Sequence, residues 1–326
     1  MKRLDNYWYS QNPVAWVLWP VSLVFCLISA LRKFFYKINL LKTPEIPVPV
    51  IIVGNISVGG TGKTPLLIAL CRQLQAQGFK PGIISRGYGG QASSWPQNVT
   101  AASSAVQVGD EPVLIAKRTA CPVVVGPDRV EDTKQLLAEN ECNIILSDDG
   151  LQHYRLQRDI EIAVIDAGRL NGNGFCLPAG PLREPEYRLN SVDMVIYNGG
   201  GAQSLSFSLE PDQLSSVNHQ NDSLSLESLR NKSVHAIAGI GNPDRFFSLL
   251  ESSGIKLIKH RFPDHYCYTA EDLCFNDELP ILMTEKDAVK CQHFDIANSW
   301  YLPVNAVVSE ETRIKFNQLI KQVDNG

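Results

Sequence analysis

The hydrophobic pattern begins with a long uncharged stretch. No charged residue occurs from Asn6 to Leu31, and within Val14–Leu31 only Ser22 and Ser29 are polar. Eighteen residues of α-helix span about 27 Å, close to the hydrocarbon thickness of a bilayer. The pattern therefore predicts a membrane-associated helical segment within residues 1–46.

The residues around this stretch favour membrane attachment over two other interpretations. Its first half is rich in aromatic side chains, as at a headgroup interface (Tyr7, Trp8, Tyr9, Trp16 and Trp19), and Arg32, Lys33 and Lys37 follow directly. A signal peptide would need an A-x-A-like cleavage site, which is absent. A buried core helix fits poorly with so many aromatic residues. Pro20 removes a backbone donor and favours a kink, so spanning the bilayer and lying in its interface both stay open.

Downstream, short apolar runs alternate with helical patterns. The predicted strands are residues 47–53, 83–85, 121–125, 143–149, 160–166 and 192–197, and the predicted helices include 65–77 and 128–140. Such alternation predicts an α/β fold of the P-loop NTPase type, in which helices flank a mostly parallel sheet. We assign residues 47–215 to this kinase-like core.

Residues 201–231 are rich in Ser, Gln, Asn and Asp and indicate a boundary or connecting hairpin. A second αβ pattern follows, with strands at 234–238 and 280–283 and a helix at 243–253. We therefore expect a smaller C-terminal α/β domain over residues 216–326.

Composition narrows the function. The 326 residues are 44% hydrophobic and 20% charged, which excludes a disordered chain and suggests about two domains. Eight cysteines without a C-x-x-C pair exclude a zinc ribbon and fit a reducing compartment. The formal charge is −4, but residues 1–47 carry +4 and the remainder −8. An acidic body argues against nucleic acid as a partner.

The strand at 47–53 runs into a glycine-rich loop and then a helix, as in a phosphate-binding loop. Glycine backbone amides and the helix N-terminus suit a phosphate, Lys63 would reach the β- and γ-phosphates of ATP, and Thr64 would ligate Mg²⁺. The candidate nucleotide-binding residues are Ser57, Val58, Gly59, Gly60, Thr61, Gly62, Lys63 and Thr64. Ser57 stands where the usual P-loop pattern has its first glycine.

Two adjacent carboxylates, Asp148 and Asp149, follow the apolar run at 143–147. Carboxylates at the end of a strand beside a P-loop are typical Mg²⁺ ligands. A regulatory GTPase is excluded, since Ser147 stands three residues before Gly150 and Thr284–Asp287 reads T-E-K-D instead of N-K-x-D. A phosphoryl transferase or another kind of ATPase, such as a membrane-tethered ATPase that drives a partner, remains; a non-catalytic scaffold is disfavoured by the carboxylates.

Seven motifs then occur in one characteristic order. They are Gly54–Pro65, Ser85–Gly89, Gly109–Pro112, Asp148–His153, Leu177–Pro185, Gly239–Pro243 and Pro263–His265. In this order they resemble the tetraacyldisaccharide 4′-kinase (lipid A 4′-kinase) family, over residues 1 to about 290. Ser57 is shared with that family, whereas Tyr266 stands where many members carry a second histidine.

The resemblance implies a kinase that transfers the γ-phosphate of ATP to the 4′-hydroxyl of a tetraacylated glucosamine disaccharide 1-phosphate in lipid A biosynthesis. It implies work at the cytoplasmic face of the inner membrane, on a lipid substrate, with ATP and Mg²⁺. We expect a monomer. Because the implied site takes residues from both parts of the chain, we also expect closure on ATP.

The resemblance also implies roles for individual residues. Asp110 matches the family's catalytic base, and His265 orients it or raises its basicity, with Lys63 as the third catalytic residue. Glu111 is either a metal contact or a loop carboxylate. Arg183 and Arg129 are candidates for phosphate binding by side-chain forks, and His153 is expected near the site.

Overall fold

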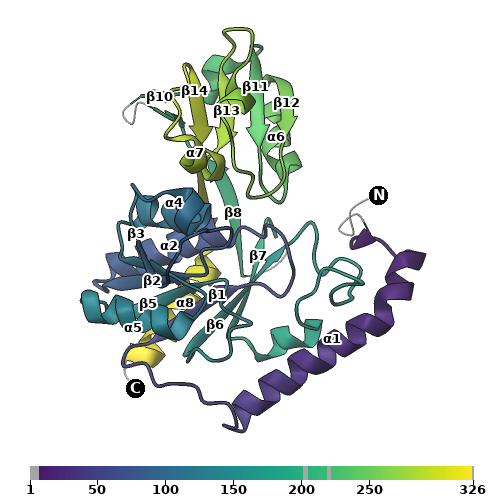
Figure 1. Ribbon diagram of the computed structural model, residues 1–326, viewed down its shortest axis with the longest axis vertical. Helices are drawn as coiled ribbons and strands as arrows, with labels where there is room; N and C mark the ends of the chain where they lie inside the picture. Colours follow the sequence, from purple (N-terminus) through teal and green to yellow (C-terminus); the bar gives the residue numbers. More distant parts are fainter. Residues whose placement is uncertain (1–6, 201–204, 219–221, 325–326) are drawn as a thin grey trace. The chain divides into compact units, whose positions relative to one another are not determined.

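The computed structural model describes residues 7–200, 205–218 and 222–324 (Figure 1). Contacts divide the chain into two compact units. Unit 1 comprises the chain up to Arg86, Gly126–Leu209 and the chain from Ala306 onward, and unit 2 comprises Gly87–Val125 and Glu210–Asn305. Lys2 and Arg3, which contribute to the positive charge of residues 1–47, lie outside the described residues.

Unit 1 is built on a mostly parallel sheet. Its strands lie in the order β15 (Val304–Val308), β8 (Ser206–Pro211), β7 (Met194–Asn198), β6 (Ile160–Asp166), β1 (Val50–Gly54), β5 (Ile144–Asp148) and β2 (Pro81–Ser85). The pairs that join β8 through β2 are parallel. Strand β1 is buried along its whole length, as expected for a Val- and Ile-rich central strand of a covered sheet.

Helices flank this sheet and confirm the predicted α/β class. Helix α2 (Lys63–Ala76) packs on β1 and β5, and α5 (Arg129–Glu139) packs on β2. Helix α8 (Glu310–Asp324) and the 3-10 helix η2 (Glu186–Ser191) also belong to the unit. The register pairs Val53 of β1 with Asp148 of β5, so the glycine loop and the two carboxylates leave the same edge of the sheet.

Unit 2 has its own sheet, in the order β10 (Ser223–Leu224), β9 (Leu214–Ser216), β14 (Ser299–Leu302), β13 (Ile281–Thr284), β11 (Ser233–Ala238) and β12 (Lys256–Arg261). Strands β14 through β12 are parallel, and β9 runs antiparallel to β14 and β10. Helix α6 (Pro243–Ser252) packs on β11 and β12, and Phe247 and Leu250 enter the core. The 3-10 helices η3 (Leu226–Leu229) and η4 (Glu271–Leu273) are short connections.

The remaining elements of unit 2 come from earlier in the chain. They are β3 (Gln97–Val99), β4 (Val123–Val125), α3 (Ala105–Val108) and α4 (Asp110–Thr119). Helix α4 packs against α7 (Glu285–Cys291). This packing groups residues 87–125 with the later part of the chain. The compact units therefore differ from the predicted linear division at residue 215. That division into domains stays a prediction.

The described part of residues 201–231 is more ordered than a connecting hairpin. Strands β9 and β10 do form an antiparallel hairpin, but β8 joins the sheet of unit 1 by parallel pairing with β7. Leu205, Phe207 and Leu209 alternate with polar residues, so strand β8 carries a period-2 apolar signal within an otherwise polar segment. Phe207 is buried.

Near the amino terminus, α1 (Pro13–Lys37) is one helix that continues through Pro20. Asn12 caps it, since its Oδ1 accepts a hydrogen bond from the Ala15 amide at 3.0 Å. Only Ala15 and Ser22 of the helix are buried. The alternative of a buried core helix is therefore wrong, and α1 is long and apolar enough to cross a membrane.

The buried residue Ser22 attaches α1 to the loop that follows β6. Its hydroxyl donates to the Cys176 carbonyl at 2.8 Å and accepts from the Ala179 amide at 3.0 Å. The Trp16 ring packs edge-on against Phe175. One polar contact set thus fixes α1 to this loop, while the outer face of the helix stays exposed.

Candidate active site

The glycine loop between β1 and α2 has the backbone that phosphate binding requires. Gly62, the N-cap of α2, has φ +87°, a conformation that side-chain-bearing residues rarely adopt. A Cβ at Gly62 would also overlap the Asn198 amide nitrogen, which donates to the Thr61 carbonyl at 3.0 Å. The site therefore needs glycine at this position for both conformation and space.

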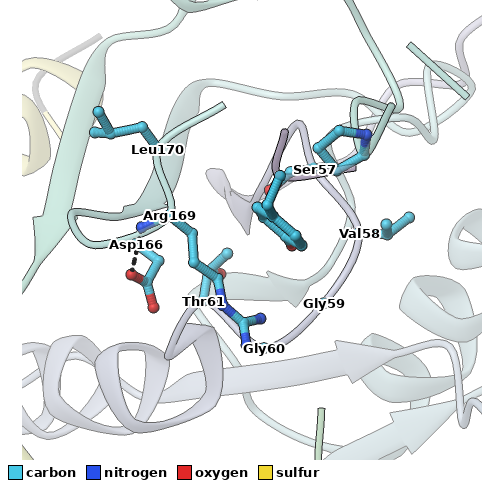
Figure 2. Close-up of a pocket in the computed structure, with 10 residues that line it drawn as sticks. Ser57, Val58, Gly59, Gly60, Thr61, Asp166, Arg169 and Leu170 are labelled. Carbon is cyan, nitrogen blue, oxygen red and sulfur yellow. Dashed lines mark hydrogen bonds between the residues drawn. The ribbon is translucent and has the colours of Figure 1, made fainter. Parts of the chain in front are cut away.

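A second segment supports the start of the loop, where Ser57 and Val58 lie (Figure 2). The Val58 amide donates to the Pro181 carbonyl at 2.8 Å, and the Arg183 amide donates to the Ile56 carbonyl at 2.6 Å. Ser57 forms an antiparallel bridge with Leu182. The motif Leu177–Pro185 thus acts as a backbone support for the predicted nucleotide-binding residues.

Lys63 and Arg183, two of the side chains predicted to bind phosphate, both contact Asp149. Lys63 Nζ lies 3.5 Å from Asp149 Oδ1 and donates to Asn55 Oδ1 at 3.1 Å, and Arg183 Nη1 lies 2.8 Å from Asp149 Oδ2. Burial opposes ionisation of Asp149, but these cations outweigh it and lower its pKa to about 2. A cation pair held by one carboxylate beside a glycine loop is well placed to bind a phosphate.

The predicted metal ligands Thr64 and Asp148 lie at the same edge of unit 1. Asp148 ends β5, is buried and accepts from Ser85 Oγ at 3.3 Å, while Thr64 is in the first turn of α2. Within the described residues no group of three or more His, Cys, Asp or Glu side chains forms a metal cluster. Mg²⁺ in phosphate sites takes one or two carboxylates together with phosphates and waters, so this donor set fits that ion.

Arg129 and His153 lie close to this site but face protein groups. The buried Arg129 guanidinium donates to the carbonyls of Gly126, at 2.7 Å, and Asp148, at 3.4 Å. Burial and the Arg129 charge lower the pKa of His153 to about 4, so this histidine is neutral at pH 7. Their assignment as phosphate or substrate ligands stays a prediction.

In unit 2 the structure joins Asp110 and His265, which are 155 residues apart. Asp110 opens α4 directly after Gly109, which has φ +91°. A Cβ on Gly109 would lie only 2.9 Å from the Tyr88 carbonyl oxygen, so this position has no room for a side chain. His265 Nδ1 lies 3.1 and 3.2 Å from the two carboxylate oxygens of Asp110. The pairing that the family resemblance implied is therefore present in the geometry.

Two lysines of α7 complete this cluster, and no sequence motif singles them out. Lys286 Nζ lies 3.1 Å from Glu111, 3.4 Å from Asp264 and 4.0 Å from Asp110, and Lys290 Nζ lies 3.8 Å from Asp110. They stand four residues apart on one helix face, and Lys286 belongs to the T-E-K-D string that fails as a GTPase motif. Glu111 is thus an ion-pair partner of Lys286.

These contacts set the ionisation of the pair. Burial opposes the charge on Asp110, but the hydrogen bond with His265 and the Lys286 charge outweigh it, and its pKa is lowered. Burial likewise opposes charging of His265, yet the hydrogen bond to Asp110 raises its pKa. An ionised, buried carboxylate that contacts an imidazole can accept a proton from a hydroxyl group.

Comparisons with known proteins identify the family of this chain. The family model described as tetraacyldisaccharide-1-P 4′-kinase matches residues 14–323. The tetraacyldisaccharide 4′-kinase of Nitrosococcus oceani is 48% identical over 321 residues, covering 97% of this chain and 94% of that protein. The Methylobacillus flagellatus enzyme of the same name is 49% identical over 308 residues, covering 94% and 92%.

A solved structure supports the same assignment. The crystal structure of LpxK from Aquifex aeolicus in complex with ATP matches with a TM-score of 0.80 and 29% identity, covering 95% of this chain and 99% of that one. A match over nearly the whole chain in family model, sequence and structure leaves one conclusion. The chain belongs to the tetraacyldisaccharide-1-phosphate 4′-kinase family.

Proposed function

We propose that the loop Ser57–Thr64 holds the phosphates of ATP and that the chain transfers the γ-phosphate to the 4′-hydroxyl of a tetraacyldisaccharide 1-phosphate. The carrying observation is the convergence of Lys63 and Arg183 on Asp149 beside the glycine loop. Family membership supports the identity of both substrates.

In unit 1 the residues act by positioning and by neutralising charge. Backbone amides of the glycine loop and the N-terminus of α2 bind phosphate oxygens, and Lys63 and Arg183 exchange the Asp149 carboxylate for phosphate oxygens. Fixed cations stabilise the charge that spreads over the phosphoryl oxygens during transfer. Asp149 keeps both cations oriented before the nucleotide arrives.

Thr64, Asp148 and Asp149 would hold Mg²⁺, which neutralises phosphate charge when bound. Glu111 belongs instead to the ion pair with Lys286, and we assign it no metal role. Arg129 donates to the backbone carbonyl of Asp148 and so supports the end of β5.

Asp110 is the proton acceptor in this proposal. Its carboxylate takes the proton of the 4′-hydroxyl as the oxygen attacks the γ-phosphate, and His265 Nδ1 holds the carboxylate in orientation and in its ionised form. Lys63, Asp110 and His265 are thus the catalytic set.

The substrate's acyl chains and helix α1 point to one location. An exposed apolar helix with Arg32, Lys33 and Lys37 in its last turns suits a bilayer with anionic headgroups, and we place the enzyme at the cytoplasmic face of the inner membrane as a monomer.

The test is direct. Purified protein is incubated with Mg²⁺, γ-labelled ATP and a tetraacyldisaccharide 1-phosphate, and we expect label in the lipid at the 4′-position in proportion to the ADP formed. ATP hydrolysis at the same rate with and without lipid, and no labelled lipid, would instead identify a membrane-tethered ATPase.

A further inference from the structure

Arg169 lies at the edge of the unit 1 sheet from which the glycine loop leaves, and the proposed mechanism assigns it no role. It follows β6, the neighbour of β1 on the side opposite β5, so its turn leaves the sheet next to the glycine loop. Asp166 Oδ1 accepts from the amides of Gly168, at 2.9 Å, and Arg169, at 3.1 Å. This turn fixes the backbone from which the Arg169 side chain starts.

The Arg169 guanidinium reaches the loop itself. Figure 2 shows the side chain extending from its turn toward Gly60. Nη1 lies 3.7 Å from the point that a Cβ on Gly59 would occupy, and Arg169, Gly59 and Gly60 line one pocket with Tyr9. Above Gly60 no heavy atom lies within 4 Å of the corresponding point, so this side of the loop is open.

Arg169 differs from the other cations of unit 1 in what holds it. Lys63 and Arg183 are neutralised by Asp149, whereas the Arg169 guanidinium packs over the Tyr9 ring at 5.4 Å. Among the residues that the structure describes, no carboxylate pairs with this guanidinium. An aromatic face holds a cation in place without consuming its hydrogen-bond donors.

These observations point to a phosphate as the missing partner. Arginine presents a planar fork of donors that matches phosphate oxygens, and this fork stands over a loop whose glycines expose amides. A cation whose charge is not cancelled by a neighbouring carboxylate is most effective where negative charge develops during transfer.

We propose that Arg169 is a catalytic residue that contacts the terminal phosphate of the nucleotide, and that Tyr9 is the residue that positions it. This rests on the proposed binding of ATP by the loop. The N-terminus of α2 lies at the far end of the loop, where it suits the inner phosphates and where Lys63 starts its reach toward the terminal one. Gly59 and the Arg169 guanidinium stand at the beginning of the loop. The 1-phosphate of the lipid offers the same chemistry, and the experiment separates the two sources.

The experiment compares Arg169→Ala, Arg169→Lys, Tyr9→Ala and Tyr9→Phe with the unchanged full-length enzyme. Arg313→Ala is the matched control, because that arginine is exposed on α8 and pairs with Glu310. The dissociation constants of ATP and ADP are measured by calorimetry, and kcat and both KM values by lipid phosphorylation. Melting temperatures verify that each variant folds.

For Arg169→Ala we expect kcat to fall about 100-fold or more and ATP binding to weaken about tenfold, with ADP binding and the lipid KM unchanged. Arg169→Lys should recover part of kcat, since it keeps the charge but not the fork. Tyr9→Ala should give a smaller defect of the same kind, whereas Tyr9→Phe, which retains the ring, should match the unchanged enzyme.

Two results would overturn the inference. One is a kcat within twofold of the unchanged enzyme together with equal ATP and ADP affinities; the other is a rise confined to the lipid KM, which would assign Arg169 to the lipid phosphate. Lys63→Ala in the same series separates the two proposals. If Lys63→Ala loses ATP binding while Arg169→Ala does not, only the role of Arg169 fails, and if neither loses it, the nucleotide site itself is misplaced.

Discussion

The two charged sites of this chain are built in opposite ways. In unit 1 the loop that we propose for phosphate binding is one contiguous segment. The groups we assign to the phosphates are largely backbone amides, whose positions follow from glycines such as Gly62. In unit 2 the Asp110 cluster is assembled from side chains of separate segments and has little backbone contribution. A backbone site depends on local conformation, whereas a side-chain cluster depends on charge balance, so the two should respond differently to substitution and pH.

The largest effect is expected for Lys63→Ala. Turnover should fall about 1000-fold, because a cation on the transferring phosphoryl group is lost, while Arg183 still neutralises Asp149 and the fold is retained. Steady-state phosphorylation of the lipid, with a melting curve as folding control, measures this. Near-normal kcat in a folded variant would remove the loop from the mechanism.

This contrast also explains what the sequence predicts. Local sequence patterns are enough to predict the strands, the glycine loop and the carboxylates Asp148 and Asp149. Their proximity could be predicted too, because the carboxyl ends of parallel strands meet at the same edge of the sheet. Asp110 and His265 could be paired only through the family resemblance, since no local pattern links positions so far apart.

Three features could not be predicted from the sequence, because they depend on contacts between residues that are far apart in the chain. Lys286 and Lys290 have the four-residue spacing of an ordinary solvated helix face, and only the packing of α7 on α4 turns them toward Asp110. The position of Arg169 depends on the order of β6 and β1 in the sheet. The grouping of residues 87–125 with the later chain likewise depends on tertiary packing.

Folding shifts the pKa values of His153 and His265 in opposite directions: the pKa of His153 is lowered and that of His265 is raised. Burial and Arg129 lower the pKa of His153 to about 4, so folding excludes a proton that the unfolded chain binds near pH 6.5. The stability from this group is complete above pH 6.5 and is lost as the pH falls toward 4. The loss is about 2 kcal/mol once the shift is discounted for solvent screening of this partly exposed side chain.

His153→Gln should remove that part of the acid destabilisation, measured by urea unfolding at pH 7.5 and pH 4.5. His293→Gln, a change at an exposed histidine, is the control. Identical losses of stability between the two pH values in His153→Gln and unchanged protein would contradict the buried neutral state.

In unit 2, Lys286→Met tests whether charge balance controls the ionisation of Asp110. The Lys286 charge lowers the pKa of Asp110, so its loss should raise that pKa and move the acidic limb of the kcat profile to higher pH. On that limb kcat falls about tenfold for each pH unit by which the limb moves. Lys286→Arg should restore the profile, and Lys117→Met on α4 should leave it unchanged. A uniform decrease in kcat, with the limb at its original pH, would mean that Lys286 acts only structurally.

The smallest effect concerns helix α1, outside both sites. Replacing the exposed Leu27 and Ile28 by glutamate should weaken attachment to anionic vesicles and raise the lipid KM several-fold, with the KM for ATP unchanged. Ile314→Glu, at an exposed apolar residue of α8, controls for added charge. Unaltered vesicle binding would place the attachment elsewhere in the chain.

The central claim is that Asp110 accepts the hydroxyl proton and that His265 keeps it ready to do so. A double-mutant cycle of Asp110→Ala and His265→Ala, followed by kcat over the full pH range, tests this most directly. We predict that each single variant loses kcat strongly with ATP affinity within a few-fold, that the double variant is hardly worse than the poorer single one, and that His265→Ala moves the acidic limb to higher pH. Additive losses, together with recovery of Asp110→Ala at raised Mg²⁺, would contradict the account and make Asp110 a metal ligand.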